Sequence, residues 1–256
     1  MVRNDLGKDN QLKDRTGEVS YTKYGTKATI IQYINNKKVL VEFDDDYKYC
    51  YYTTYINFTH GRLTNPYDKS IYGVGFIGNG NYDSHHISYP VWFNMIKRCY
   101  KEQKSYDDES YEDCVVDTEW HNFQNFAKWY EENMYVCNEK LVIDKDIKTH
   151  GNRIYTKENC MLLPERINLL FIKEKARRGN LPIGVYFQKE KGNYVAMCSV
   201  DRKTKYIGSY SNPQIAFNHY KEFKEEHINK VLENYIGILP DDVYEEIKKY
   251  KIEITD

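Results

Sequence analysis

Polar side chains that could bind a divalent metal ion gather in one stretch of this chain. Asp144 and Asp146 flank Lys145 at the end of a short apolar run, and Asn168 follows the turn signal of Pro164. If the run is a strand and the next segment a helix, these oxygens can converge on one hard cation. Carboxylate and amide oxygens suit Mg²⁺ or Mn²⁺. An Asp in a strand and an Asn in a helix are, however, also common in proteins that hold no metal.

Two further residues lie between the strand run and the helix. His150 stands on the turn that follows the run, and Asn159 could hold the loop that presents the first strand.

The surrounding pattern predicts the elements that must position these residues. A strand over 141–147, a tight turn at His150, an extended segment over 155–163 and a helix from Pro164 follow one another. Upstream, two apolar stripes at helical spacing predict helices packed into a core. Their residues are Trp92, Met95, Ile96 and Cys99 in one stripe, and Phe123, Phe126 and Tyr130 in the other.

Several motifs within residues 81–171 can be compared with known families. They are Asp144-Lys145-Asp146-Ile147, Glu158-Asn159-Cys160-Met161-Leu162-Leu163-Pro164 and Ile167-Asn168, with the flanks Tyr89-x-x-Trp92-x-x-Met95-x-x-Arg98-Cys99-Tyr100 and Trp120-x-Asn122-Phe123-x-x-Phe126-x-x-Trp129. Together they resemble the ββα-metal core of HNH endonucleases, with flanks similar to those of phage-encoded HNH-like proteins. The resemblance implies metal-assisted hydrolysis of DNA, with Mg²⁺ or Mn²⁺ at Asp144 or Asp146 and at Asn168.

The sequence departs from the HNH pattern at the general base. The family has a histidine directly after the strand aspartate, and here that position holds Lys145 or Asp146. A histidine titrates near neutral pH and can take a proton from water, whereas an ordinary lysine is protonated at pH 7 and cannot. His150 or Asp146 could replace the missing histidine. The catalytic residues that the resemblance implies are therefore Asp144, Lys145, Asp146, His150, Asn159 and Asn168. Alternatively, the site is degenerate and serves only as a scaffold.

A strongly basic region follows. Residues 172–211 hold nine Lys or Arg against three Asp or Glu, whereas residues 81–171 hold 11 against 16. Alternation and turn residues predict strands over 184–189, 194–200 and 205–210, and Asn212-Pro213 opens a helix. Basic side chains contact DNA phosphates, while Gln and Arg can read base edges. The predicted DNA-binding residues are Arg177 and Arg178 in a basic linker, and Tyr186, Gln188, Lys189, Lys191, Tyr194, Arg202, Lys203, Lys205 and Tyr206 on one sheet face.

The same region resembles a known DNA-binding family. Its motifs are Gly184-Val185-Tyr186-Phe187, Tyr194-Val195-Ala196, Tyr206-Ile207-Gly208-Ser209-Tyr210 and Ala216-Phe217-x-x-Tyr220. They are similar to the Apetala/ERF-type domain, in which three antiparallel strands pack on one helix. The resemblance covers about residues 180–235 and implies that the sheet enters the major groove of double-stranded DNA. Some Arg and Trp positions of the family hold Tyr or Lys here.

The first 80 residues carry no catalytic signature. Strands over 28–34, 39–43 and 48–58 are expected from alternation and aromatic content, which is typical of a small β domain. Tyr47, Tyr49, Tyr51, Tyr52 and Tyr55 could form a stacking or partner surface, or one side of a half-buried strand.

Composition excludes some classes of protein. The 256 residues carry a net charge of -1 and are 15% aromatic, which disfavours disorder. No apolar run approaches the ~20 residues that span a bilayer, and the N-terminus is polar. We expect a cytoplasmic, intracellular protein without a membrane partner, in the host cytosol if it is phage-encoded. The six cysteines form no C-x-x-C pair, so zinc is not expected, although Cys99, Cys114, Cys137 and Cys160 leave a distributed thiolate site open.

These observations predict an α+β protein in four segments. Residues 1–80 form a small β domain, 81–171 an HNH-like ββα core with flanking helices, and 172–179 a basic linker. Residues 180–256 form a three-stranded antiparallel sheet on a helix, with a final helix. The predicted function is a DNA-binding endonuclease of the HNH homing type. One alternative is a catalytically degenerate DNA-binding protein that regulates transcription or blocks a host defence factor. The other is an acidic protein-interaction module.

Overall fold

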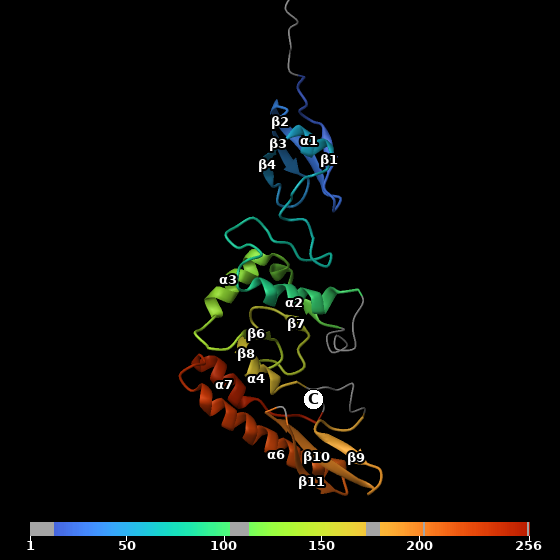
Figure 1. The fold of residues 1–256 in the computed structure, drawn as a ribbon, viewed down its shortest axis with the longest axis vertical. Coiled ribbons are helices and arrows are strands. Elements are labelled where there is room, and N and C mark those ends of the chain that lie inside the picture. Colours follow the sequence, from blue (N-terminus) through green and yellow to red (C-terminus); the bar gives the residue numbers. More distant parts are fainter. Residues whose placement is uncertain (1–12, 103–112, 173–179, 202, 255) are drawn as a thin grey trace, which may run out of the picture. The chain divides into compact units, whose positions relative to one another are not determined.

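The protein is described by a computed structural model that covers residues 13–102, 113–172, 180–201, 203–254 and 256 (Figure 1). The fold is of the expected α+β class, and the chain divides into two compact units. The first comprises residues 1–86 and 121–124, and the second residues 87–120 and 125–256. The domain boundaries expected at 80 and 171 remain predictions.

The first unit is built on a four-stranded antiparallel sheet in the order β1-β2-β3-β4. Its strands are β1 (Val19–Tyr21), β2 (Lys27–Asn35), β3 (Lys38–Phe43) and β4 (Cys50–Thr53). Alternate residues of β2 and β3 point into the core, as the period of two requires. The fully buried residues of these strands are Ala28, Ile30, Val39, Val41 and Phe43.

The third strand expected in this unit is only partly correct. β4 ends at Thr53, and Tyr55–Thr59 form the short helix α1. Oγ1 of Thr54 accepts a hydrogen bond from the backbone N–H of Asn57 at 3.2 Å, which caps the helix, and Phe58 is buried beneath it. The aromatic residues of this segment suit a strand, but the capping threonine and a buried helical residue decide its conformation.

The apolar stripes lie on two helices, which belong to the second unit except for residues 123–124. They are α2 (Tyr89–Tyr100) and α3 (Phe123–Asn133), and all seven stripe residues are buried, so core packing is confirmed. Between the helices lie strand β5 (Val115–Val116) and a short 3-10 helix (Thr118–His121). Trp92 Nε1 donates a hydrogen bond to the Trp120 carbonyl at 2.7 Å, which ties α2 to this connection.

Strands β6 (Leu141–Asp144) and β8 (Met161–Pro164) pair in antiparallel fashion, and helix α4 (Glu165–Leu169) follows directly. The helix expected from Pro164 is therefore confirmed. The single extended segment expected over 155–163 is wrong, because β7 (Ile154–Tyr155) pairs in parallel with β5 instead. A turn separates β7 from β8, in which the Cys160 N–H donates to the Thr156 carbonyl at 3.0 Å.

The C-terminal part contains the expected three-stranded antiparallel sheet packed on a long helix (Figure 1). Its elements are β9 (Val185–Gln188), β10 (Asn193–Val200), β11 (Lys203–Tyr210) and α6 (Pro213–Leu232). Oδ1 of Asn212 accepts hydrogen bonds from the N–H groups of Gln214 at 2.7 Å and Ile215 at 3.4 Å, so the predicted cap is confirmed. A 3-10 turn (Glu233–Tyr235) and helix α7 (Asp241–Lys249) complete the unit.

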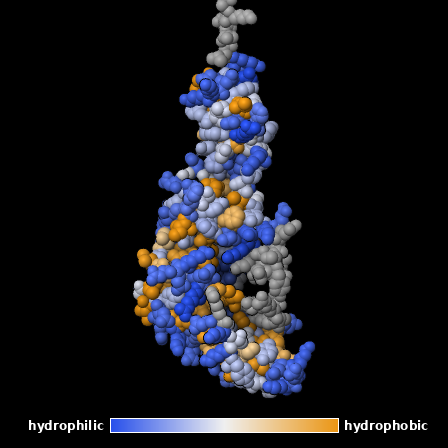
Figure 2. Space-filling view, in the orientation of Figure 1, coloured by the Kyte–Doolittle hydropathy of each residue, from blue (hydrophilic) through white to orange (hydrophobic). Residues whose placement is uncertain are grey.

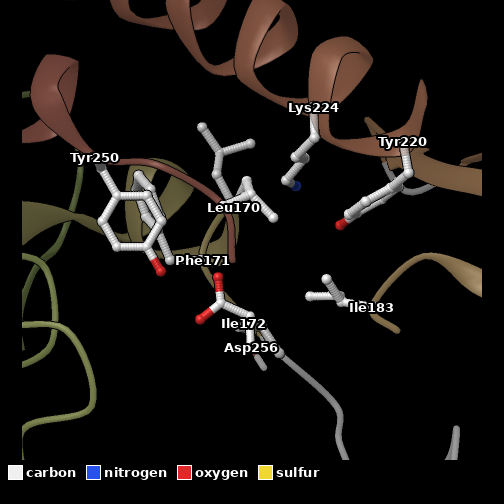
Figure 3. A pocket seen from close by; sticks show the side chains of 9 residues that line it. Leu170, Phe171, Ile172, Ile183, Tyr220, Lys224, Tyr250 and Asp256 are labelled. Atoms are coloured by element: carbon white, nitrogen blue, oxygen red, sulfur yellow. The ribbon is translucent and has the colours of Figure 1, made fainter. Parts of the chain in front are cut away.

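One hydrophobic core lies beneath both the β6–β8 pair and the C-terminal sheet. Leu163 and Ile167 belong to the same buried cluster as Ala196 and Phe217. The core is thus continuous between residues that flank the expected 172–179 linker. A small cavity beside α6 is lined by Tyr220 and Lys224 of the helix and by residues of other segments, including Ile183, Tyr250 and Asp256 (Figure 3).

None of the helices in the described ranges has the length and apolar character needed to cross a bilayer. On the face that Figure 2 shows, hydrophilic residues cover much of the surface and hydrophobic residues lie between them in smaller groups.

Candidate active-site loop and nucleic-acid interface

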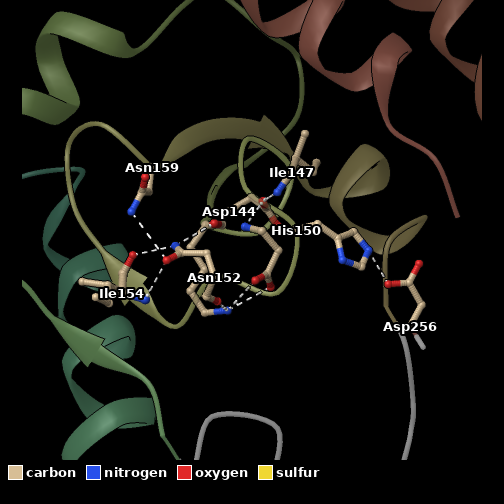
Figure 4. A network of polar contacts seen from close by, with 9 residues as sticks. Asp144, Ile147, His150, Asn152, Ile154, Asn159 and Asp256 are labelled. Carbon is tan, nitrogen blue, oxygen red and sulfur yellow. Dashed lines mark hydrogen bonds and ion pairs between the residues drawn. The ribbon is translucent and has the colours of Figure 1, made fainter. Parts of the chain in front are cut away.

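Asp144 ends strand β6 and shapes the loop that connects it to β8. Its Oδ1 accepts hydrogen bonds from the backbone N–H groups of Asp146 at 2.8 Å and Ile147 at 2.9 Å (Figure 4). An aspartate that bonds its own backbone two and three residues on reverses the chain direction. Burial raises the pKa of the Asp144 carboxyl, while these two hydrogen bonds oppose that shift. The carboxylate is therefore part of the fold of the loop.

Lys145 is the buried centre of the same loop. Its side chain is nearly inaccessible, and Nζ donates to both carboxylate oxygens of Asp146, at 2.8 and 2.9 Å, and to the Asn152 carbonyl at 2.9 Å. Nζ also lies 5.7 Å from the centre of the Tyr155 ring. With three acceptor atoms around its three protons, Lys145 stabilises the loop, and Asp146 neutralises its charge.

Two asparagines complete the loop. Nδ2 of Asn152 donates to the carbonyls of Lys145 at 2.9 Å and Ile154 at 2.7 Å, and its Oδ1 accepts from the Ile154 N–H at 3.1 Å. Nδ2 of Asn159 lies 3.5 Å from Oδ1 of Asn152. Asn152 has a larger share in the loop than sequence reasoning assigned to it. The signal was its place after Gly151, which adopts a positive φ of 73°.

His150 projects from this loop toward the end of the chain. Its Nε2 lies 2.5 Å from Oδ1 of Asp256, and its Nδ1 lies 3.9 Å from Oε2 of Glu253 (Figure 4). The Asp256 side chain is buried, and the Tyr250 ring lies 5.6 Å from the imidazole. No local pattern around His150 could reveal these partners, because they lie about a hundred residues further along the sequence.

The metal ligands expected in this region have different surroundings. Asp146 gives both oxygens to Lys145, and Asp144 gives one oxygen to the backbone. Asn168 is half-buried in α4, which starts directly after Pro164. Pro164 pairs with Leu141 at one end of the β6–β8 ladder, whereas Asp144 lies at the other end. Within the part of the chain that the structure describes, no three His, Cys, Asp or Glu side chains form a metal-binding group. The donor set therefore fits Mg²⁺ poorly, since an ammonium occupies one of the expected carboxylates.

The C-terminal sheet has two different faces, which the strand register defines. Residues paired across an antiparallel sheet point to the same side. Val185, Ala196 and Cys198 are buried in the core with α6, so their partners in the register also face the helix. The opposite side is here called the outer face, and Val195 is buried at 1% exposure within it. The other residues of the outer face are Tyr186, Gln188, Asn193, Met197, Ser199, Thr204, Tyr206 and Ser209.

The predicted DNA-binding residues are divided between these faces. Tyr186 and Tyr206, which are 39% and 60% exposed, lie on the outer face with Gln188. Tyr194 lies on the helix side, with its ring 5.0 Å from Phe187. Lys203 and Lys205 also belong to that side, and Nζ of Lys205 lies 4.7 Å from the Phe223 ring of α6. Lys189 and Lys191 are exposed in the β9–β10 turn, while Arg177, Arg178 and Arg202 lie outside the described residues.

A β-bulge sets the sides of Lys203, Lys205 and Tyr206, whereas Tyr194 lies on the helix side through its regular pairing with Phe187. The register shifts between Ala196 and Met197, so that Ile207 has no partner and the residues before it change sides. Without the shift, Lys205 would lie on the outer face and Tyr206 on the helix side. The only local signal is Gly208, where an added Cβ would come within 2.3 Å of the Tyr210 hydroxyl.

Comparison of the chain with protein-family models, with curated proteins and with solved structures finds no match.

Proposed function

We propose that this protein binds double-stranded DNA through the outer face of the β9–β10–β11 sheet. The observation that carries the proposal is the second face of a sheet whose first face packs on α6, because Tyr186 and Tyr206 are exposed there around the buried Val195. That face presents the exposed rings of Tyr186 and Tyr206 and the amide of Gln188. The β9–β10 turn beside it carries the exposed amines of Lys189 and Lys191.

The chemistry of these groups matches the requirements of DNA recognition. The major groove is wide enough for a β-ribbon, and a Gln amide can form two hydrogen bonds with adenine. Lysines at the end of the sheet can contact phosphates and fix the orientation on the duplex. Aromatic rings on the same face add apolar contact area, for example with thymine methyl groups. The resemblance to the Apetala/ERF-type domain points to the same face.

Anisotropy titration of labelled duplexes tests this proposal. We expect Gln188→Ala with Tyr206→Ala to weaken binding by about 1–3 kcal/mol and to reduce the difference between preferred and other sequences. Lys230→Gln, an exposed change on α6, is the control and should leave binding unchanged. No affinity of the unmodified chain for any duplex would refute the proposal and favour an acidic protein-interaction module.

DNA hydrolysis at the β6–β8 loop is a second candidate function. It is favoured by one specific observation, the antiparallel pair β6 and β8 followed at once by α4, which is the ββα order of HNH endonucleases. Asp144 stands at the end of the first strand of that unit. The degenerate alternative is favoured by two ion pairs that occupy candidate catalytic residues. Lys145 pairs with Asp146, and His150 pairs with Asp256.

Nicking of supercoiled plasmid in Mg²⁺ or Mn²⁺ separates these two alternatives. Asp144→Asn is the informative variant, because an amide oxygen can still accept the two backbone hydrogen bonds while the charge is lost. Metal-dependent nicking that both Asp144→Asn and Asn168→Ala abolish would support the nuclease. Binding of DNA without nicking in either metal would leave the degenerate alternative.

A further inference from the structure

The five tyrosines that could form a stacking or partner surface have different environments in the first unit. Three of them are half-buried and pack against its hydrophobic core, namely Tyr49, Tyr51 and Tyr55. Tyr47 and Tyr52 are 50% and 49% exposed. The Tyr52 ring already carries a cation of this chain, because Nζ of Lys38 lies 4.5 Å from its centre. The neighbours of Tyr47 are instead aromatic.

The Tyr47 ring lies on another aromatic ring. The ring centres of Tyr47 and Tyr67 are 3.8 Å apart and their planes are inclined by 6°, so the two rings stack in parallel. Phe76, which is buried, lies 5.7 Å from the Tyr47 ring at an interplanar angle of 64°. Because half of Tyr47 remains exposed, the stack ends in a ring that is open to solvent.

Two polar side chains fix the positions of both stacked rings. Oδ1 of Asp45 accepts hydrogen bonds from the N–H groups of Tyr47 and Lys48, both at 2.9 Å. Oδ1 of Asn65 accepts from the Tyr67 N–H at 3.1 Å. The two side chains also bond to each other, since Nδ2 of Asn65 donates to Oδ2 of Asp45 at 2.5 Å. The exposed ring is thus held in place before any partner arrives, which lowers the entropic cost of binding.

The exposed ring lies among acidic groups. Residues 42–47 hold four Asp or Glu and no Lys or Arg. Partial burial raises the pKa of the Tyr47 hydroxyl, and the charges of nearby groups, Asp46 among them, raise it further. Lys48 pairs with Asp44 at 2.5 Å, whereas the Asp46 side chain is exposed beside the ring. This charge favours a cationic ligand on the ring and opposes the phosphates of a nucleic acid.

We propose that Tyr47 and Asp46 bind an arginine side chain from a basic segment of a partner protein. A guanidinium is planar, so it stacks on an aromatic face while its N–H groups reach a neighbouring carboxylate. In the complex the guanidinium lies on the open side of the Tyr47 ring and donates to Asp46. The site belongs to the first unit, so it uses neither the DNA-binding sheet nor the β6–β8 loop.

Anisotropy titration of the full chain with labelled peptides tests the proposal. The probe is a peptide of alternating Gly and Arg, and a Gly-Lys peptide of the same length and charge is the comparison. We expect the arginine peptide to bind more tightly and Tyr47→Leu to weaken its binding about tenfold, as the loss of a cation–π contact does. Tyr52→Leu removes an equally exposed tyrosine of the same unit and should leave the affinity unchanged.

Asp46→Asn is a second variant that removes an exposed charge and leaves the ring stack in place. It should weaken binding of the arginine peptide several-fold, so the test does not depend on any effect of Tyr47→Leu on the fold. Equal binding of the two peptides would overturn the proposal, and so would an arginine affinity that neither variant lowers or that Tyr52→Leu lowers equally.

A single-stranded oligonucleotide separates the proposed ligand from a nucleobase, which can also stack on an exposed ring. Binding of the oligonucleotide that Tyr47→Leu weakens would overturn the proposal, because it would assign the ring to a base. We expect Tyr47→Leu to have no effect on any such binding. None of these measurements uses duplex DNA, so failure of the arginine site is distinguishable from failure of the proposed function.

Discussion

Replacement of Asp144 by Asn or Ala separates its role in the fold from a role in chemistry. The Asp144 Oδ1 accepts two backbone N–H groups at 2.8 and 2.9 Å, and both come from the residues that start the loop. Alanine leaves these two donors without their acceptor, whereas the amide oxygen of asparagine can keep both bonds. The two variants therefore differ in the hydrogen bonds and share the loss of charge.

The magnitude follows from those bonds. A hydrogen bond contributes about 0.5–1.5 kcal/mol net, and an orphaned buried donor costs about 1–3 kcal/mol. We expect Asp144→Ala to lower the free energy of unfolding of the second unit by about 2 kcal/mol. Asp144→Asn should change it by no more than about 0.5 kcal/mol in the destabilising direction, because relief of the buried charge offsets weaker hydrogen bonds.

The pH dependence has a defined sign. The pKa of Asp144 is raised in the folded protein above its usual value of 3.8. The folded state thus holds its proton to higher pH than the unfolded state, and wild-type stability from this group falls as pH rises through that window. The side chain of Asp144→Asn does not titrate, so the variant does not lose stability in this pH range. Its stability relative to wild type should therefore increase from about pH 4 up to the folded pKa and stay constant above it.

Urea unfolding followed by tryptophan fluorescence measures these differences. All three tryptophans, Trp92, Trp120 and Trp129, are buried in the second unit, so the signal reports on the unit that contains Asp144. Equal destabilisation by Asn and Ala would refute the role of the two backbone hydrogen bonds. A pH-independent difference between wild type and Asp144→Asn would refute the buried charge.

Two further substitutions test the packing around the site. Lys145→Met removes the buried ammonium with its three hydrogen bonds and leaves Asp146 without its ion-pair partner. We therefore expect the free energy of unfolding, measured in urea, to fall by about 2–3 kcal/mol. A decrease below about 1 kcal/mol would contradict the loop network. Gly184 has a φ of 73°, and a Cβ there would come within 2.1 Å of the Tyr220 ring. We expect Gly184→Ala to cost about 3 kcal/mol or more through strain and overpacking, with a lower thermal midpoint and weaker DNA binding; an unchanged midpoint would show that Tyr220 can move aside.

Local patterns were sufficient for much of the fold. The strands and the cap of α6 follow from alternation, from turn residues and from Asn212-Pro213, because each of these signals lies within a few residues of the element that it defines. The apolar stripe at Trp92 and Met95 predicted a buried helix face for the same reason. The segment after Thr54 shows the limit of this reasoning. Its aromatic residues predicted a strand up to residue 58, but Thr54 caps the short helix α1 instead.

The candidate site depended on contacts that no local pattern contains. Sequence reasoning found Asp144, Lys145 and Asp146 together, but their hydrogen bonds to one another and to Asn152 appear only in the folded loop. The pairing of β7 with β5 and the contact of His150 with Asp256 join segments far apart in the chain. On the sheet, the bulge at Ile207 determines on which face Lys205 and Tyr206 lie.

The salt dependence of DNA binding tests the central proposal most directly. Each lysine that neutralises a phosphate contributes about one unit to the slope of log K against log salt concentration. Lys189→Gln with Lys191→Gln should therefore reduce the slope by about two relative to the unmodified chain, whereas Lys230→Gln should leave it unchanged. An unchanged slope in the double variant would contradict docking of the β9–β10 turn on DNA.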